Sequence, residues 1–232
     1  MNAPAHPAPL APALAVLAAH GTSAVSDALD LIGQAGQIWG PRRVSGSGTV
    51  VGPVFTVAFE PAPEGRAAAA DYIDEVPPGC VVLLAGNGPL CTVWGDILSE
   101  YARAHGVAGT VIDGLCRDVD RIRELSYSVW ARGEFMRSGK NRVRMSATQV
   151  PVEVGGDALP TTVRPGDVVC ADGSGVTVVP AGSVDDVAEQ VSRIAAMEER
   201  VLAEVRAGSG LREARGKHGY NMAARVARST VA

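Results

Sequence analysis

The sequence predicts an α/β fold in which parallel βαβ units form a central sheet flanked by helices. Strand-like and helix-like patterns alternate between residues 80 and 125, and such alternation is typical of neighbouring parallel strands joined by right-handed crossovers. The composition agrees, because 47% of the residues are hydrophobic, only 4% are aromatic and 27 are glycines, as in closely packed globular proteins. For 232 residues we predict a single domain over residues 1–232, with a core at about 20–205 and a C-terminal helix and arm at 206–232.

The N-terminal part of the chain is expected to hold helices and then strands. Apolar residues recur at approximately helical spacing over residues 14–32, interrupted at Gly21, which predicts two short helices that stop at Gly33. Residues 44–59 are β-like, with glycines that bound apolar runs. Residues 67–75 are typical of a short helix, which the Pro-Pro-Gly sequence that follows would end.

The central part carries the alternation on which the fold prediction rests. A strand is predicted at residues 80–85, followed by a helix that starts at Asp96 as its N-cap and stops at Gly106. A second strand is predicted at 107–112 and a second helix at 119–125. Because the carboxyl ends of neighbouring parallel strands meet at one edge of a sheet, the two loops that precede these helices are expected to lie side by side.

The remainder of the chain is mostly β-like and ends in helical patterns. The predicted strands lie at residues 128–131, 142–154, 167–171 and 176–179, the last two on either side of a turn at 172–175. A long helix is predicted at residues 184–205, and the segment from Gly208 onward is predicted to be a helix or an arm.

Charge, cysteine content and hydropathy exclude several classes of protein. A net charge of −4 does not indicate the basic surface that nucleic-acid-binding proteins typically carry. The four cysteines show no spacing typical of zinc sites or disulfide frameworks, which favours a reducing compartment. The N-terminus lacks the basic start of a signal peptide, and its apolar run is too short for a membrane span. We therefore expect a cytoplasmic protein without nucleic-acid or membrane partners.

Two polar pairs follow the two central strands and form the candidate site. Gly95-Asp96 opens one predicted helix and Arg117-Asp118 opens the next, so both pairs are expected in the crevice where α/β proteins bind ligands. Free N–H groups at a helix start hold carboxylates, arginine binds the same anion, and aspartate offers hard oxygen ligands to divalent cations. Together these groups suit a chelated 2-oxo acid. The alternative is structural, with an N-cap at Asp96 and a surface charge pair at Arg117 and Asp118.

The same residues resemble a known family. The runs WGDIL (94–98) and GVAGTVIDGLCRDVD (106–120) are similar to the signature of the RraA-like family, which includes the 4-hydroxy-4-methyl-2-oxoglutarate / 4-carboxy-4-hydroxy-2-oxoadipate aldolases. Further similarity lies at residues 25–29, 151–152, 155–156, 164–169 and 175–180. The resemblance covers most of residues 20–205. It implies a swivelling β/β/α fold of the RraA-like type, a homotrimer or hexamer, and an active site between subunits.

The resemblance also implies roles for the candidate residues. In the aldolases of this family an aspartate-x20-arginine-aspartate pattern binds pyruvate and Mg²⁺ or Mn²⁺. Carried over to this chain, the metal ligand is Asp118 and the residues that bind the pyruvyl group are Gly95, Asp96, Ile97, Leu98 and Arg117. Arg117 and Asp96 are then the expected catalytic residues, with Asp96 positioning the water that carries the proton.

The implied activity is that of a class II, pyruvate-type aldolase. Such a metal-dependent lyase cleaves a small-molecule 4-hydroxy-2-oxo acid to release pyruvate, with oxaloacetate decarboxylation as a side activity. One alternative is a non-catalytic regulator that binds a ribonuclease, as the founding member of the family does. Another is a specialised biosynthetic enzyme with the same metal-enolate site, for which the only hint is the DGSG turn at 172–175, where many relatives carry an acidic run.

A cation-rich segment lies outside these motifs. Residues 132–144, RGEFMRSGKNRVR, carry five cations in thirteen positions. The segment is predicted either to receive the far carboxylates of a polyanionic substrate or to be a solvated strand face.

Overall fold

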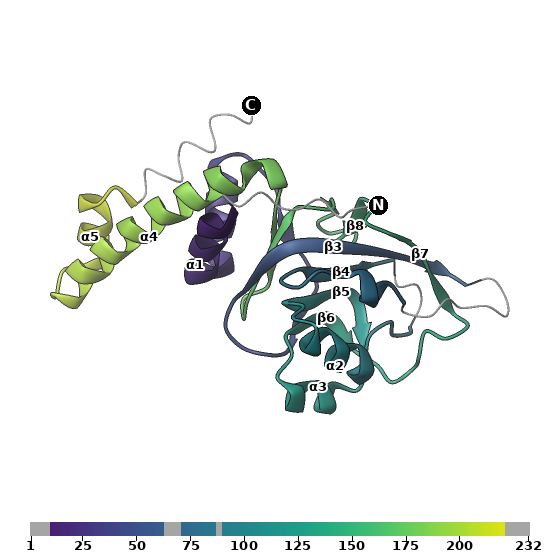
Figure 1. The fold of residues 1–232 in the computed structure, drawn as a ribbon. Helices are drawn as coiled ribbons and strands as arrows, with labels where there is room; N and C mark the ends of the chain where they lie inside the picture. Colours follow the sequence, from purple (N-terminus) through teal and green to yellow (C-terminus); the bar gives the residue numbers. More distant parts are fainter. Residues whose placement is uncertain (1–9, 63–70, 87–89, 221–232) are drawn as a thin grey trace.

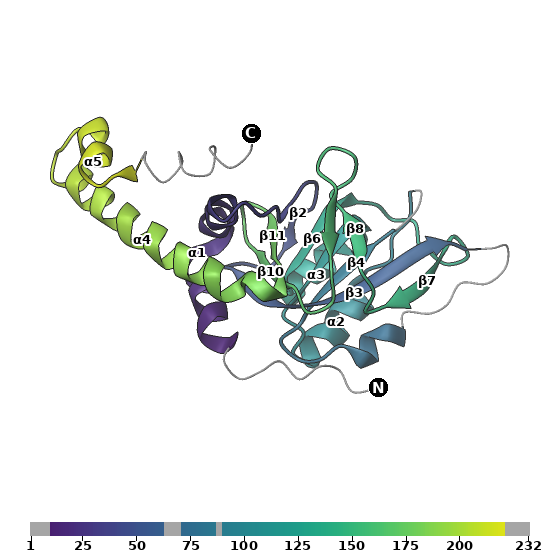
Figure 2. The same ribbon diagram turned by 90° about the horizontal axis from the view of Figure 1, so that it is seen from above.

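The computed structural model describes residues 10–62, 71–86 and 90–220, and it is built around one large sheet (Figures 1 and 2). Nine strands of the described residues form this sheet in the order β1-β11-β10-β3-β4-β5-β6-β2, with β7 pairing to β3. The pairings β3–β4, β4–β5 and β5–β6 are parallel and the others are antiparallel. The predicted α/β fold with parallel βαβ units is confirmed. The strands are β1 (Gln37–Ile38), β2 (Arg42–Ser45), β3 (Val50–Pro61), β4 (Val81–Ala85), β5 (Gly109–Cys116), β6 (Val129–Glu134), β7 (Val143–Thr148), β10 (Val168–Ala171) and β11 (Val176–Val179).

The sheet is curled, and four helices pack against its outer face in two groups, whereas α5 packs against α4 (Figure 1). Along β3, Phe55 and Val57 contribute to the core under α2 and α3, whereas Val54 belongs to the core on the inner face. The other group, α1 and α4, packs on β10 and β11. A separate hairpin of β8 (Val152–Val154) and β9 (Thr161–Val163) lies over the inner core. The helices are α1 (Leu10–Leu31), α2 (Asp96–Ala104), α3 (Val119–Leu125), α4 (Val184–Arg206) and α5 (Leu211–Lys217), with 3-10 turns η1 (Asp71–Glu75) and η2 (Ala181–Ser183).

The parallel strands β4 and β5 position the candidate site. All five residues of β4 are buried, as expected for a parallel strand covered on both faces. The prediction that the next strand ends at Ile112 was wrong, because β5 continues to Cys116. After an irregularity beyond Ile112, β5 resumes its pairing with β6, where Leu115 lies opposite Gly133 and Cys116 opposite Glu134. Residue 117 therefore follows the end of β5 directly.

Most other element predictions are confirmed, with three adjustments. The prediction of one strand at 142–154 was wrong, because this segment forms β7, which pairs with β3, and β8, which pairs with β9 in a separate hairpin. The predicted helix at 67–75 lies partly outside the described residues, and its described part is the 3-10 turn η1. The segment after Gly208 forms the helix α5, and residues 221–232 lie outside the described part. The single-domain organisation stays a prediction. Among the described helices, none combines the length and apolar character needed to cross a membrane.

The predicted break at Gly21 divides α1 into two helical segments. Gly21 has φ 75° and ψ −175°, a conformation that favours glycine, and a Cβ there would lie 2.6 Å from Oδ2 of Asp172. The carboxylate of Asp172 accepts hydrogen bonds from the backbone N–H of Thr22 at 2.8 Å and from its hydroxyl at 2.6 Å. Asp172 therefore caps the second segment of α1 from the turn between β10 and β11, far away in the sequence.

Replacing Asp172 with alanine is expected to lower the free energy of unfolding at pH 7 by about 1–2 kcal/mol, since the buried Thr22 would lose its partner. Burial alone would raise the pKa of Asp172, but the hydrogen bonds from Thr22, Ser174 and Gly175 outweigh burial and lower the pKa. The carboxylate therefore stabilises the fold above the unfolded-state pKa of about 3.9, and this stabilisation is lost as the pH falls through the lower folded-state pKa.

Urea unfolding of wild type and Asp172→Ala between pH 3 and pH 7 would measure this difference. The gap between the two proteins should narrow below about pH 4. Asp157→Ala, at an exposed loop position, is the control and should unfold like the wild type. A constant gap over the whole pH range would contradict the assignment of the effect to an ionised cap.

Candidate active site

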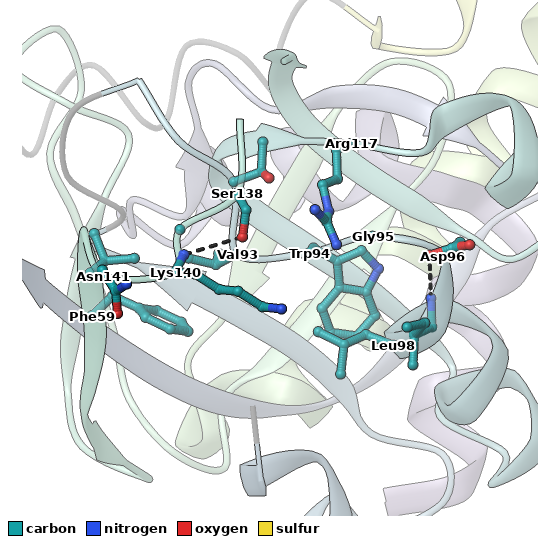
Figure 3. Close-up of a pocket in the computed structure, with 14 residues that line it drawn as sticks. Phe59, Val93, Trp94, Gly95, Asp96, Leu98, Arg117, Ser138, Lys140 and Asn141 are labelled. Atoms are coloured by element: carbon teal, nitrogen blue, oxygen red, sulfur yellow. Dashed lines mark hydrogen bonds between the residues drawn. The ribbon is translucent and has the colours of Figure 1, made fainter. Parts of the chain in front are cut away.

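A cavity of about 510 Å³ lies at the carboxyl ends of β3, β4 and β5 (Figure 3). Its volume is typical of small-molecule sites. Five of the six predicted site residues line it, namely Gly95, Asp96, Ile97, Leu98 and Arg117. The sixth, Asp118, forms an ion pair with Arg117 beside the cavity. The remaining lining residues are Phe59, Thr92, Val93, Trp94, Ser138, Gly139, Lys140, Asn141 and Val143. The two loops that the sequence placed at one edge of the sheet are thus brought together.

The carboxylate of Asp118 faces the start of α2 and not its own helix. Asp118 has φ 58° and ψ 33°, in the left-handed region that aspartate tolerates better than most residues. It occupies the N-cap position of α3 but makes no side-chain cap hydrogen bond. Its Oδ2 instead lies 3.2 Å from Nε of Arg117 and accepts a hydrogen bond of 3.4 Å from the backbone N–H of Asp96. Both side chains of the Arg117–Asp118 pair are about one third exposed, at 35% and 36%, so they remain accessible to a ligand.

Gly95 allows this close approach between the two loops. Its backbone is extended, with φ −162° and ψ −163°, so any residue could adopt the conformation. The constraint is space, because a Cβ on Gly95 would lie 2.5 Å from Oδ2 of Asp118 and 3.1 Å from Nε of Arg117. The glycine is therefore required by the positions of the two charged side chains.

The prediction that Asp96 is the N-cap of its helix was wrong. The N-cap of α2 is Gly95, whose carbonyl oxygen accepts a hydrogen bond from the N–H of Ser99. Asp96 is the first helical residue, and its Oδ1 accepts a hydrogen bond of 2.8 Å from the N–H of Ile97. The extended backbone at Gly95 shifts the helix start by one residue. The Asp96 carboxylate consequently stands at the cavity wall beside the N–H groups of the first turn (Figure 3).

A buried tryptophan holds the loop before α2 in place. Trp94 is 1% exposed and stacks on Tyr127 with ring centroids 6.3 Å apart. Its indole N–H donates to Oγ of Ser99 at 2.8 Å, and that hydroxyl donates to the carbonyl of Gly95 at 2.9 Å. The Trp94 carbonyl accepts a hydrogen bond of 3.2 Å from the N–H of Arg117. This network ties the β4 loop to the end of β5 and fixes the backbone on both sides of the cavity.

The cysteine next to Arg117 is a buried thiol. Cys116 is buried beneath the site, and burial raises the pKa of its thiol to about 12. A thiol with such a pKa stays protonated at neutral pH and is therefore a weak nucleophile. The candidate functional groups that follow β5 are the charged side chains of Arg117 and Asp118.

The sequence did not identify the opposite wall of the cavity. The loop between β6 and β7 contributes Ser138, Gly139, Lys140 and Asn141, and β3 contributes Phe59. These segments come together because β7 pairs with the far end of β3, and because the loop is bound to Thr92 by two backbone hydrogen bonds of 2.9 Å. The sequence did single out the cation-rich segment 132–144. The spacing of its residues, however, does not indicate that part of it lies opposite the central strands.

The five cations of that segment have different surroundings. Arg132 pairs with Asp113 at 2.6 Å and Arg144 pairs with Glu60. Arg137 lies over the ring of Phe135, and Arg142 donates to loop carbonyls. Only Lys140 is a lining residue of the cavity within the described part of the chain. Four of the five cations thus contact other groups of this chain, and whether Lys140 receives a substrate carboxylate stays a prediction.

Asp118 and its surroundings are chemically suited to hold a hard divalent cation. Among the described residues, Oδ1 of Asp118 has no hydrogen-bond partner, whereas Oδ2 faces Arg117 and Asp96. No group of three or more His, Cys, Asp or Glu side chains placed to hold a metal occurs in residues 10–62, 71–86 and 90–220. Mg²⁺ needs no such group, because it keeps several waters and is typically bound by one or two carboxylates together with oxygen atoms of the substrate.

Comparison with known proteins finds relatives over most of the chain. The sequence model of the RraA-like family, described as Aldolase/RraA, matches residues 22–178. "Protein DlpA" of Legionella pneumophila is 37% identical over 200 residues, which are 84% of this chain but only 32% of that protein. A protein of Halalkalibacterium halodurans named "Putative 4-hydroxy-4-methyl-2-oxoglutarate aldolase" is 31% identical over 77% of this chain and 81% of its own length.

Solved structures show the same fold. An uncharacterized protein from Pseudomonas syringae pv. tomato matches 88% of this chain and 97% of its own, with a TM-score of 0.80 and 37% identity. RraAS2 of Streptomyces coelicolor, described as an unusual member of the RNase ES inhibitor RraA protein family, matches 90% of this chain and 100% of its own, with a TM-score of 0.72 and 26% identity. The RraA-like fold class expected from the sequence is confirmed.

Proposed function

The chain belongs to the Aldolase/RraA family, and on that premise we propose that it is a divalent-metal-dependent lyase. It cleaves a 4-hydroxy-2-oxo acid to release pyruvate and decarboxylates oxaloacetate as a side reaction. The observation that carries the proposal is the meeting of Arg117 and Asp118 with the N-terminus of α2 beside one cavity. The name of the relative from Halalkalibacterium halodurans points to the same reaction class.

The chain supplies two groups for the carboxylate end of the substrate. Arg117 offers a guanidinium fork that binds a carboxylate through paired hydrogen bonds. The start of α2 offers the positive end of the helix dipole, which favours the same anion. The N–H groups of Asp96 and Ile97 already donate to the carboxylates of Asp118 and Asp96. Asp118 would hold Mg²⁺ or Mn²⁺, with waters and the substrate as further ligands. When bound there, the cation acts as a Lewis acid that stabilises negative charge developing on the 2-oxo oxygen.

The remaining residues handle protons and orientation. In the cleavage, the bond between C3 and C4 breaks, its electron pair forms the enolate of pyruvate, and the 4-hydroxyl group loses its proton as it becomes a carbonyl. One proton must then be added at C3. Asp96, at the cavity wall beside Arg117, is placed to orient the water that carries these protons. The Arg117 guanidinium, fixed by its pairing with Asp118, stabilises charge on the enolate.

Pyruvate release measures the proposed activity. Wild-type protein is expected to release pyruvate from 4-hydroxy-4-methyl-2-oxoglutarate and from oxaloacetate with Mg²⁺ or Mn²⁺, to lose this activity with a chelator, and to regain it when excess metal is added. Each assay needs a blank with metal but without protein, because free divalent cations decarboxylate oxaloacetate. Absence of turnover above this blank with every divalent metal tried would reject the lyase.

The alternative function is that of a regulator that binds a ribonuclease, supported by the likeness to RraAS2 at 26% identity. A regulator needs a surface for its partner but no intact metal site. Ribonuclease inhibition by wild type and by Asp118→Ala, compared at equal concentration, discriminates the two functions. Equal inhibition by both proteins together with no turnover would favour the regulator.

The turn at 172–175, the one hint for a specialised biosynthetic enzyme, lies outside the candidate site. The turn at 172–175 is not part of the lining around Arg117, and its Asp172 caps α1. The homotrimer or hexamer, the site between subunits and the choice between Mg²⁺ and Mn²⁺ stay predictions.

A further inference from the structure

We infer that Arg132 is a positioning residue of the candidate site, because it closes a β-bulge in β5 that sets the position and direction of Arg117 and Asp118. Arg132 lies on β6 and is not a lining residue of the cavity. Its effect on the reaction rests on the proposed function. Its effect on the positions of the two charged side chains can be measured without turnover.

The bulge lies in the last part of β5, just before the candidate site. Parallel pairing with β6 stops after Ile112 and resumes at Leu115. The two residues of β5 between these points lie opposite a single residue of β6, which is Arg132. Such an extra residue shifts and re-aims the side chains that follow it, and bulges of this kind are common next to active sites.

An ion pair spans the bulge. Nε of Arg132 donates to Oδ1 of Asp113 at 2.6 Å, and the Asp113 side chain is only 12% exposed. Nη2 of Arg132 donates to the carbonyl of Trp39 at 3.1 Å. Gly40 leaves room for the guanidinium, because a Cβ there would lie 2.2 Å from Nη1. Arg132 is thus held by two segments and holds the carboxylate of the bulge in one place.

The segment after the bulge leads directly to the site. Leu115 forms a parallel bridge with Thr92, on the loop before α2, and the N–H of Arg117 donates to the carbonyl of Trp94 at 3.2 Å. In Figure 3 the Arg117 side chain extends from the end of β5 toward Trp94. Without the extra residue this segment would move by about 3.3 Å along its neighbours. Arg117 would then lose Trp94, and Asp118 would no longer face the start of α2.

The ion pair is needed because a bulge is poorly fixed by the sheet itself. Ladder hydrogen bonds are interrupted where two residues oppose one, so side-chain contacts must determine the conformation there. The alternative is a structural role, in which Arg132 merely fastens the segment of Trp39 to β6. That role predicts a loss of stability without any change in the positions of Arg117 and Asp118.

Crystal structures of the wild type and Arg132→Met separate these roles. We expect the Asp118 carboxylate, whose Oδ2 lies 3.2 Å from Nε of Arg117, to be displaced in the variant. Arg132→Met leaves the Asp113 carboxylate unpaired and is expected to lower stability. The double variant Asp113→Ala/Arg132→Met contains no unpaired charge, so it should fold well and show the same displacement.

Kinetics of pyruvate release measure the consequence for the reaction. In the single and the double variant kcat/KM should fall by about 10²-fold, the usual effect of displacing reacting groups by an ångström. Arg132→Lys can keep the ion pair with Asp113 and should retain most of the activity. Arg144→Gln is the matched control, because it removes an arginine that pairs with Glu60 between β7 and β3, and it should be fully active.

Unchanged positions of Arg117 and Asp118 in both variants would overturn the inference, as would displaced side chains together with a wild-type kcat/KM. Lower thermal stability with unchanged positions and kcat/KM would leave Arg132 a structural role only. A wild-type protein without turnover would defeat the proposed function instead, and the crystal structures alone would then decide whether Arg132 positions the two side chains.

Discussion

Replacing Asp118 with alanine is expected to reduce metal-dependent pyruvate release by about 10²–10³-fold, the usual effect of removing one preorganised electrostatic group. In the proposed site the carboxylate would bind the cation through its Oδ1, and it forms an ion pair with the Arg117 guanidinium through Oδ2. Both functions disappear in the variant. Steady-state rates with saturating Mg²⁺ or Mn²⁺ measure the loss, and titration of Mn²⁺ followed by paramagnetic resonance measures binding of the metal independently of turnover.

The fold should tolerate this change with a small loss of stability, because the side chain is 36% exposed and makes no cap hydrogen bond in α3, and only the left-handed backbone at residue 118 disfavours alanine. Asp120→Ala supplies the matched control. Asp120 is an aspartate two residues further along, its side chain is 99% exposed, and it contacts only the surface residue Arg123 among the described residues. Full activity is expected for it. If Asp118→Ala bound Mn²⁺ as tightly as the wild type, the metal assignment would be wrong even if activity fell.

The half of the site that depends on local sequence could be predicted. The βαβ alternation around 80–125 fixes β4 and β5 as parallel neighbours, so the loops that contain Gly95 and Arg117 had to meet at one edge. The error in this half of the site concerns a single position, the residue at which α2 starts. Whether Gly95 or Asp96 is the N-cap depends on the backbone conformation of Gly95, which is extended and places the first helical residue at Asp96.

The other half depends on pairings between segments distant in the sequence. Lys140 reaches the cavity because β7 pairs with β3, whose Phe59 lies opposite Met145. No periodicity in residues 132–144 encodes that register, which is decided by packing of the whole sheet. Asp172 is a similar case, because the turn at 172–175 reads as a simple hairpin connection although its carboxylate caps α1. Chemistry at the ends of adjacent parallel strands is thus more predictable than chemistry on the loops that close over them.

Replacing Gly95 with alanine is expected to lower activity about as much as the loss of Asp118, although no functional group is removed. Because the backbone of Gly95 is extended, alanine can adopt its conformation without strain. The substitution therefore disturbs only the positions of the charged side chains nearby. The new Cβ would lie 2.5 Å from Oδ2 of Asp118, and the carboxylate must move away from Arg117 and from the start of α2. Sites of this kind lose about 10²-fold when reacting groups are displaced by an ångström.

The stability of Gly95→Ala should change little, because the clash is with ends of partly exposed side chains that can rotate. Gly182→Ala, at a position with open space around the added methyl group, controls for the substitution itself and should be neutral in both assays. Because Gly95→Ala acts through Asp118, combining it with Asp118→Ala should cause little further loss, whereas independent effects would multiply. Thermal unfolding and kcat/KM of the wild type, the two single variants and the double variant complete this double-mutant cycle. A fully active Gly95→Ala protein would mean that the position of the Asp118 carboxylate, on which the proposed metal site depends, is not required for the reaction.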